Sequence, residues 1–461
     1  MTLLHQKEST RKGKVLSPGR VSMLSYAVLI LLGAFLLLLP ASTEKGHLGF
    51  IDALFTSASA VCVTGLAVVD TAATFTFFGK AVIMALIQAG GIGIMVLSTM
   101  FLLTLGKRVG MTGWQMLSDT YSYGQGKNVY SLVKEILIFT FVIELIGAAL
   151  MLPDFLCSFP VDQAICYAAF HSVSAFCNAG FSLFPDSFTR YGGSWLINLD
   201  ICFLIITGGI GFIVMAEIRQ KFSFSKRCWS KLSLHTRLTL TATLILLAGS
   251  TLLFFILEWS NTLKTLPLHA KFLASFFQAV NTRTAGFNTL DIGSLTNETL
   301  FISILLMFVG TAPGSCGGGV KVTTISAIAI LGYSRFRGQE YPHIFYRRVS
   351  DASITKAVSL ILISMLVIVI GVVLLQQTEI GDVSHIQTRG VFLEILYEVV
   401  SAFGTVGLST GITAGFSGIG KLIIICIMFI GRLGPMGIAM AVSRKGKPSK
   451  FSYAQENIMI G

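Results

Sequence analysis

Charged residues are scarce in this chain. Asp, Glu, Lys and Arg make up 12% of the 461 residues, whereas 53% are hydrophobic. The surface of a soluble domain usually carries about 25–35% charged residues, so the composition excludes a large soluble domain. Proline is also infrequent, with 10 residues, and the long stretches between prolines are free to form uninterrupted helices. The composition therefore indicates an all-α membrane protein.

Sequence patterns of catalysis and metal binding are also missing. The eight cysteines form no CxxC pair, which argues against a zinc site or a disulfide framework. The histidines are dispersed, and we expect His171 to be packed in the protein rather than to bind a metal. No nucleophile–base cluster or cofactor fingerprint supports a membrane enzyme, so we expect the chain to bind no cofactor. Basic and aromatic residues do not interleave as in nucleic-acid-binding domains, and we expect no nucleic-acid partner.

Long apolar runs are abundant. Runs of 18 or more residues are typical of membrane-spanning helices, and we count eight, at about 22–40, 79–104, 130–152, 193–216, 235–258, 299–330, 353–376 and 418–442. Four apolar segments of about a dozen residues lie between them, near 49–61, 164–176, 270–281 and 392–402. These are too short to span a bilayer, so they predict re-entrant half-helices.

One pattern occurs four times along the chain. An aromatic residue opens each copy of the pattern and a glycine follows ten residues later, from Phe55 to Gly65, Phe170 to Gly180, Phe276 to Gly286 and Tyr397 to Gly407. Repetition of this kind determines an architecture. We predict four units of spanning helix, pore half-helix and spanning helix with pseudo-fourfold arrangement around one pore, at 22–106, 130–216, 235–331 and 353–442, between terminal segments 1–21 and 443–461.

The glycine-containing turns have the properties of a cation filter. The C-terminal end of a half-helix is partially negative, and glycine permits backbone conformations that aim carbonyl oxygens inward. Rings of such carbonyls can replace the water shell of a cation. The predicted filter residues are Cys62, Val63, Thr64 and Gly65; Cys177, Asn178, Ala179 and Gly180; Arg283, Thr284, Ala285 and Gly286; and Gly404, Thr405, Val406 and Gly407. We expect the Arg283 side chain to point away from the pore axis.

The sixth spanning run contains a break. It holds the segment TAPGSCGGGVK, and proline and consecutive glycines interrupt a membrane helix where the backbone lines a cavity or packs in protein. A phosphate-binding loop is excluded because Val320 separates Gly319 from Lys321, and Val322 stands where Ser or Thr is needed. The segment predicts a gate loop at 312–320; a packing kink is the alternative. Its residues are Pro313, Gly314, Gly317, Gly318, Gly319 and Lys321.

Arg432 lies about halfway along the last spanning run. A charge at this depth is costly and usually functional. We expect its guanidinium to contact the carbonyls of residues 312–319 or the water of the pore. A buried acid such as Glu144 or Asp200 is the alternative partner.

Basic residues are concentrated in five segments, at 1–20, 105–134, 217–237, 332–356 and 443–461. These segments hold most of the 34 Lys and Arg and few of the 22 Asp and Glu. The positive-inside rule places them, and thus both termini, in the cytoplasm, and the four half-helices on the outer side. Anionic membrane lipid is the expected partner of the basic loops.

The motifs resemble those of the Trk/Ktr/HKT superfamily of potassium transporters, and eight spans favour its bacterial Ktr branch. They are VCVTGL (61–66), QAGGIG (88–93), CNAGFS (177–182), TGGIGF (207–212), TRTAGFNT (282–289), APGSCGGGVK (312–321) and GRLGP (431–435). The resemblance implies potassium transport across the bacterial plasma membrane through a filter of one glycine per repeat. It also implies a gate in the broken helix, with Arg432 facing the pore.

The resemblance further implies partners. These are a second copy of the chain, forming a homodimer, and a cytoplasmic ring of KtrA-type subunits that bind ATP or ADP. Two alternatives stay open for the cargo: sodium or a less selective set of monovalent cations, and coupling of transport to sodium. An alternating-access transporter is disfavoured, because inverted repeats would support it and these repeats run in the same orientation.

Overall fold

The computed structural model describes residues 18–93, 129–221, 228–434 and 437. Outside them lie residues 1–17 and 443–461 of the predicted terminal segments, residues 105–128 of the basic segment 105–134, residues 222–227 of the basic segment 217–237, the end of the second run from 94, and the end of the last run beyond 434 apart from 437. Within them the chain is helical apart from one two-stranded hairpin, β1 (His343–Ile344) and β2 (Arg347–Arg348). The prediction of an all-α membrane protein is confirmed.

Four helices are each long and apolar enough to cross a membrane. They are α1 (Pro18–Leu38), α7 (Val129–Leu156), α12 (Leu234–Leu257) and α16 (Asp351–Glu379). They correspond to the first, third, fifth and seventh predicted runs. Many of their leucine, isoleucine and valine side chains are exposed. Such exposed apolar faces suit contact with lipid rather than water.

Each of these helices is followed by a shorter buried helix: α2 (Phe50–Cys62), α8 (Val161–Phe176), α13 (Leu268–Asn281) and α17 (Val391–Gly404). They match the four predicted half-helices. In each pair the short helix packs against the long helix that precedes it in the chain. The opening aromatic residues Phe55, Phe170 and Tyr397 are buried, so the aromatic position of the pattern anchors the half-helix in the core.

Of the helices that follow the half-helices, the sequence predicted a break in the third, and the structure shows another in the second. Helix α4 (Phe77–Ile92) ends at Gly93, α9 (Trp195–Ile210) ends at Gly211 and bends by 95° into α10 (Phe212–Lys221), and α18 (Gly418–Leu433) ends at Gly434. All three glycines have positive φ, a conformation that ends a right-handed helix. The predicted third break separates α14 (Asn297–Phe308) from α15 (Val322–Phe336).

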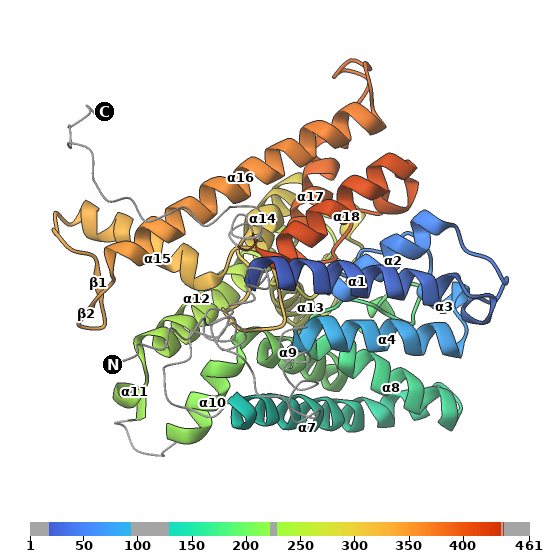
Figure 1. Cartoon of the computed structure of the whole chain (residues 1–461), viewed down its shortest axis with the longest axis horizontal. Coiled ribbons are helices and arrows are strands. Elements are labelled where there is room, and N and C mark those ends of the chain that lie inside the picture. The colour runs from blue at the N-terminus through green and yellow to red at the C-terminus, as the bar shows by residue number, and fades with distance from the viewer. Residues whose placement is uncertain (1–17, 94–128, 222–227, 435–436, 438–461) are drawn as a thin grey trace, which may run out of the picture.

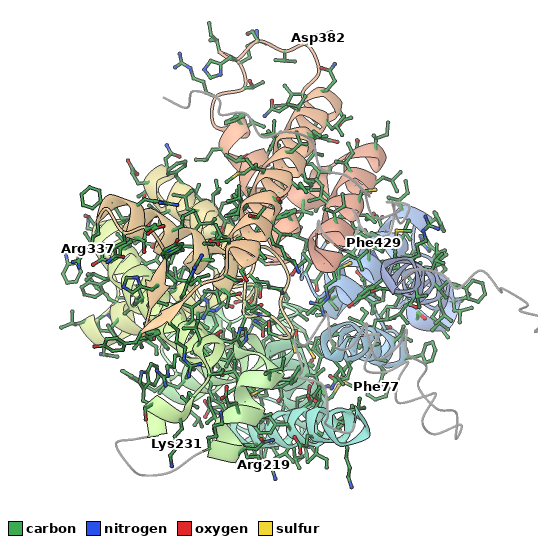
Figure 2. The ribbon with its side chains drawn as sticks, turned by 60° about the vertical axis from the view of Figure 1, so that its left-hand side comes forward. Phe77, Arg219, Lys231, Arg337, Asp382 and Phe429 are labelled. Carbon is green, nitrogen blue, oxygen red and sulfur yellow. The ribbon has the colours of Figure 1, made fainter. Side chains whose placement is uncertain are left out.

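Successive parts of the chain follow one another around a common centre (Figure 2). Helix α2 packs against α18 of the end of the chain, and α4 packs against α8, so the arrangement closes on itself (Figure 1). Short elements connect the helices: η1 (Pro40–Ser42), α3 (Thr71–Thr74), η2 (Thr189–Tyr191), α11 (Cys228–Lys231), η3 (Ile292–Ser294) and η4 (Ile412–Gly415). The hairpin and α11 lie at one end of the molecule and α3 at the other (Figure 1).

Carboxylates join the helices at the α3 end. Ser194, which caps α9, donates to Asp154 of α7 over 2.9 Å. Glu258 after α12 accepts from the backbone and hydroxyl of Thr296, which caps α14. Glu379 of α16 accepts in the same way from Ser417, the cap of α18. These bonds hold the start of a second helix against the end of the first and so orient the half-helix between them. The acids were not singled out from the sequence.

Candidate functional site

The four repeat glycines form a ring at the centre of the molecule. A Cβ built on Gly65 would lie 2.9 Å from the Cα of Gly180, one on Gly180 would lie 2.9 Å from that of Gly286, one on Gly286 would lie 3.2 Å from that of Gly407, and one on Gly407 would lie 3.0 Å from that of Gly65. Four segments that are separated by more than a hundred residues in sequence therefore meet in chain order around one line. None of the four positions has room for a side chain.

A second position in each turn also has an unusual backbone. Val63, Asn178, Thr284 and Thr405 stand two residues before the glycines and have φ of 58°, 59°, 66° and 51°. Positive φ is rare for β-branched residues, and such strain is retained where function requires it. The sequence placed these four residues in the predicted turns but did not predict their backbone conformation. Val63 and Thr405 are β-branched, and this residue type does not predict a positive φ.

The carbonyl between these two positions faces the ring. The oxygens of Thr64, Ala179, Ala285 and Val406 lie 2.1–2.8 Å from the Cβ that a neighbouring glycine would carry. All four residues are buried, and within the described ranges no N–H or O–H group donates to these oxygens. Buried backbone carbonyls are nearly always hydrogen-bonded, so four orphans in one ring require another partner. A dehydrated cation is such a partner.

Serine residues of the half-helices hold the turns from behind. Ser59 and Ser401 each accept the backbone N–H of the residue before the glycine through their carbonyl and the glycine N–H through their hydroxyl. The Ser174 carbonyl accepts from Ala179, and its hydroxyl donates to the carbonyl of Phe181. The third repeat has valine at this position, and Asn281, the next residue, accepts from Ala285 and Phe287 instead. The shared serine at the fifth position of three repeats was the signal that sequence reasoning missed.

The Arg283 side chain lies behind the ring. Its guanidinium donates to the Thr243 hydroxyl of α12 over 3.3 Å, and the residue is buried. The charge therefore points to a surrounding helix while the backbone of Arg283 takes part in the turn. The Cys62, Cys177 and Gly404 positions end their half-helices, and all three are buried.

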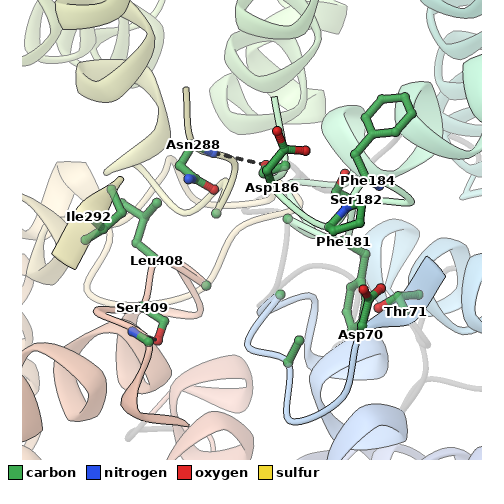
Figure 3. A pocket seen from close by; sticks show the side chains of 18 of the residues that line it. Asp70, Thr71, Phe181, Ser182, Phe184, Asp186, Asn288, Ile292, Leu408 and Ser409 are labelled. Atoms are coloured by element: carbon green, nitrogen blue, oxygen red, sulfur yellow. Dashed lines mark hydrogen bonds between the residues drawn. The ribbon is translucent and has the colours of Figure 1, made fainter. Parts of the chain in front are cut away.

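One side of the ring opens into a cavity of about 610 Å³ (Figure 3). All four ring glycines line it, together with residues that follow them in the chain. Asp70, Asp186 and Asp291 contribute carboxylates to its wall. A cavity with negative walls raises the local concentration of cations. None of these three residues was predicted as part of the site.

The other side of the ring is covered by the 312–320 loop. A Cβ on Gly317 would lie 2.1 Å from the Thr284 hydroxyl, one on Gly318 would lie 2.4 Å from that of Thr405, and one on Gly319 would lie 3.2 Å from the Cα of Gly404. The Gly318 N–H donates to the Thr405 hydroxyl over 3.0 Å. The loop thus touches the third and fourth turns directly.

The second repeat holds the opposite edge of the loop. Ala312 and Cys316 donate to the carbonyls of Gly209 and Gly208, and the Gly314 carbonyl accepts from Phe212, which follows the bend in the second repeat. Gly314 and Gly319 have positive φ. Pro313 lies between the first two contacts and supplies its carbonyl beside Gly211. The loop is therefore wedged between three of the four repeats.

Two cations secure the loop. Arg432 donates to the carbonyls of Cys316 in the loop and Gly90 in α4. Lys321 donates to the Gly317 carbonyl over 2.6 Å. The predicted contact of Arg432 with the loop is present, and the alternative acids have other surroundings: Glu144 accepts from Gln88, and both oxygens of Asp200 have no hydrogen-bond donor among the described residues.

The chain is similar to known cation transport proteins. The model of the TrkH family, described as a cation transport protein, matches residues 20–453. The chain is 41% identical to a Ktr system potassium uptake protein B of Bacillus subtilis, with 100% of both chains covered. It is 35% identical to the potassium/sodium uptake protein NtpJ of Enterococcus hirae, with 98% of this chain and 99% of the relative covered.

A solved structure shows the same fold. The potassium transporter TrkH from Vibrio parahaemolyticus superposes with a TM-score of 0.74 at 19% identity, covering 94% of this chain and 86% of that one. The family match spans the ring, the loop and Arg432 alike. The chain is therefore a multi-pass membrane protein that belongs to the TrkH family of cation transport proteins.

Proposed function

We propose that this chain moves potassium ions across the plasma membrane through the glycine ring. The observation that carries the proposal is the ring of four buried carbonyls, from Thr64, Ala179, Ala285 and Val406, that have no donor among the described residues. Oxygens arranged in this way replace the hydration shell of a cation. The relatives' names, which specify potassium uptake, give the ion.

Sodium is the second candidate. The Enterococcus hirae relative is named for potassium and sodium uptake, and it is nearly as similar as the others across its whole length. One glycine per repeat builds a shorter filter than the five-residue element of potassium channels. A shorter filter holds fewer ions at once, so it has fewer sites at which potassium and sodium are distinguished by size.

The loop at 312–320 acts as the gate in this proposal. It covers one face of the ring and leaves the other open to the cavity. Arg432 fixes the loop to α4 through two carbonyls, which links the gate to the first and fourth repeats. Movement of α15, which begins directly after the loop, would carry it aside.

The basic segments define the proposed orientation. The hairpin, α11 and the basic residues Arg219, Lys231 and Arg337 belong to segments that we place in the cytoplasm, with both termini, and the cavity then faces outward (Figures 1 and 2). The relatives are parts of a "Ktr system", which favours further components. We assign these as a second copy of this chain and a cytoplasmic ring of nucleotide-binding subunits that pulls on α15 through residues 332–356.

Ion flux into proteoliposomes tests the function. Purified chain should take up potassium and rubidium in preference to sodium when an inward-directed gradient of each cation is imposed. Equal sodium and potassium flux would favour the second candidate, and absence of any cation flux would contradict the proposal. ATP and ADP should change flux only after the nucleotide-binding subunit is added; a response of this chain alone would contradict the assignment of the regulator.

A further inference from the structure

The residue after the opening aromatic differs in each repeat, and in two repeats it is ionisable. Thr56, His171, Phe277 and Glu398 occupy this equivalent position, and all are buried. Beyond each ring glycine, the chain lines the cavity. We call residues 181–184 the second arm and residues 408–411 the fourth arm.

His171 holds the second arm by accepting a backbone hydrogen bond. The Leu183 N–H donates to Nε2 over 3.1 Å, and the Ser182 hydroxyl lies 3.2 Å from the same nitrogen. Nε2 must therefore carry a lone pair. The other nitrogen, Nδ1, lies 2.8 Å from the Tyr167 carbonyl, which can only accept, so Nδ1 carries the proton. The contacts specify one tautomer of a neutral ring.

Aromatic side chains enclose this imidazole. Phe184 of the second arm stacks on it with ring centroids 4.6 Å apart and 21° between planes. Phe155, Phe170 and Phe188 contact it at 4.9–5.9 Å. The enclosure fixes the ring orientation, so Nε2 has no alternative partner to which it could turn.

Glu398 makes the same contacts in the fourth repeat. The residues 11 and 12 positions later are Ser409 and Thr410, as Ser182 and Leu183 are for His171. Oε1 accepts from the Ser409 hydroxyl over 2.6 Å and from the Thr410 N–H over 3.0 Å, and Oε2 accepts from the Thr413 hydroxyl over 2.7 Å. Two different side chains thus perform one structural task.

The other two repeats lack this support. The Thr56 hydroxyl donates to the Asp52 carbonyl of its own helix over 2.8 Å, and Phe277 has no polar atom in its side chain. In ring order the second and fourth repeats face each other across the axis. Figure 3 shows Ser182 and Ser409 on opposite sides of the cavity. The arms are therefore supported with twofold, not fourfold, symmetry.

We propose that His171 and Glu398 are paired positioning residues that hold the second and fourth arms, and that their protonation from the cavity side lowers ion discrimination. This inference rests on the proposed filter. Each arm leaves its ring glycine directly, since Ser182 follows Gly180 and Ser409 follows Gly407 by two residues. An arm that shifts would move the glycine and the carbonyl before it.

The chemistry gives the direction of the pH effect. A proton on Nε2 replaces the acceptor with a donor that faces the Leu183 N–H, so that contact is lost. Protonation of Glu398 weakens charge-assisted bonds to the fourth arm but leaves one oxygen able to accept, so its effect is smaller. Support of the second arm by the neutral imidazole is complete at neutral pH and declines as external pH falls.

Other ionisable groups lie on the surrounding elements and could contribute. Around His171 they are Tyr167 on α8, Glu144 and Asp154 on α7, Lys80 on α4, Asp200 on α9, Asp186 beyond the second arm, and Arg190 and Tyr191 on η2. Around Glu398 they are Glu394 and Tyr397 on α17, Glu379 on α16, Lys421 on α18, Glu298 on α14 and Asp291 before η3. The variants below separate the effects of His171 and Glu398 from the effects of these other ionisable groups.

The test compares potassium and sodium flux of the full chain in proteoliposomes at external pH of about 7.5 and about 4. His171→Phe should reduce discrimination about tenfold at the higher pH, because the Leu183 N–H loses its buried acceptor. His171→Gln retains an oxygen acceptor that does not titrate, so it should keep discrimination and flatten the pH response. Glu398→Gln should remove the part of the pH response that Glu398 contributes. Thr56→Val is the matched control and should behave as the unaltered chain.

Two further measurements keep the outcomes distinct. Gly180→Ser alters the same turn directly. It could change discrimination while the His171 and Glu398 variants keep the discrimination and pH response of the unaltered chain. That result would show that the positioning role is wrong and that the filter proposal stands. If Gly180→Ser is also without effect, the filter proposal itself fails. Should His171→Phe not fold, an unchanged pH response in His171→Gln and Glu398→Gln decides against the inference. The protection factor of the Leu183 amide, which corrects for the pH dependence of the intrinsic exchange rate, should fall at the lower pH in the unaltered chain and not in His171→Gln.

Discussion

The two sides of the glycine ring differ in how much space they offer. On one side the ring glycines line a cavity of about 610 Å³ with three aspartates in its wall. On the other, Gly317 and Gly318 approach the hydroxyls of Thr284 and Thr405 so closely that neither could carry a side chain. An ion from the cavity would meet carbonyl oxygens first and packed backbone next. In the proposed function, selection and obstruction then lie in adjacent layers.

The layers also differ in what holds them. The ring is held within each repeat, by Ser59, Ser174, Asn281 and Ser401 on the half-helix that leads into the turn. The loop is held between repeats, by Gly208 and Gly209 of the second, Thr405 and Arg432 of the fourth and Gly90 of the first through Arg432. Locally held turns can keep their shape while a loop held from outside is released. The comparison predicts that the two layers can be altered independently.

Alteration of the ring should have the largest effect. Gly65→Ser or Gly286→Ser places a Cβ 2.5 Å from the carbonyl of Ala179 or Val406 at a residue with positive φ. Such strain costs about 1–3 kcal/mol, which corresponds to about 5- to 150-fold in relative ion affinity. We expect potassium discrimination against sodium to fall by that amount. Flux ratios in proteoliposomes measure it.

Gly249→Ser is the control for the ring. Gly249 lies in α12, has no atom within 4 Å of a built Cβ and does not have positive φ. It should leave expression and discrimination unchanged. Full discrimination in Ser variants of all four ring glycines would mean that ions pass elsewhere.

Shortening the loop should raise flux, whereas alteration of the ring should lower discrimination. Removal of Gly317 and Gly318 takes away the backbone that touches Thr284 and Thr405, so flux should rise by about tenfold or more, equal to ~1.4 kcal/mol of barrier. Discrimination should be preserved, because the serine contacts behind the ring remain. A folded deletion variant with unchanged flux would identify the segment as a packing kink rather than a gate.

Variants of Arg432 distinguish two explanations of a low flux: a bridge that holds the loop in place, and a charge that repels the ion. Arg432→Ala removes bonds to Cys316 and Gly90, each to a charged donor worth about 1.5–3 kcal/mol, and flux should rise severalfold. Arg432→Lys keeps the charge but cannot span both carbonyls with one planar fork. If the bridge is the barrier, the lysine variant behaves like the alanine variant; if the charge repels the ion, lysine restores low flux. Thallium flux into vesicles compares the three.

Sequence patterns located the layers but not their connections. Identical spacing of four glycines predicted the turns, and the Pro-Gly segment predicted the third break, because both signals are local in sequence. The break at Gly211 and the ends of α4 and α18 at Gly93 and Gly434 were missed, since one glycine inside an apolar run is a weak signal for a helix end.

Contacts between distant segments were equally invisible. Arg432 reaches Gly90 across more than three hundred residues, and no periodicity records such a pairing. The positive φ of Val63 and Thr405 follows from the closing of the ring around them, and a β-branched residue predicts the reverse. The missing information concerned how repeats meet, not what each repeat contains.

The smallest expected effect tests how the ring of repeats is closed. Lys421 of α18 pairs with Asp52 of α2 over 2.8 Å, and the side chains are 14% and 29% exposed, so this pair joins the last repeat to the first. Partly exposed ion pairs contribute about 0.2–1 kcal/mol. Lys421→Met and Asp52→Asn should each lower the melting temperature slightly, and the double variant should lose less than the sum of both. Discrimination and flux should stay unchanged, because neither residue touches a filter turn or the loop. Additive losses in the double-mutant cycle would show that the two charges act separately, and the closure would then rest on the packing of α2 against α18 and on the contact of Arg432 with Gly90.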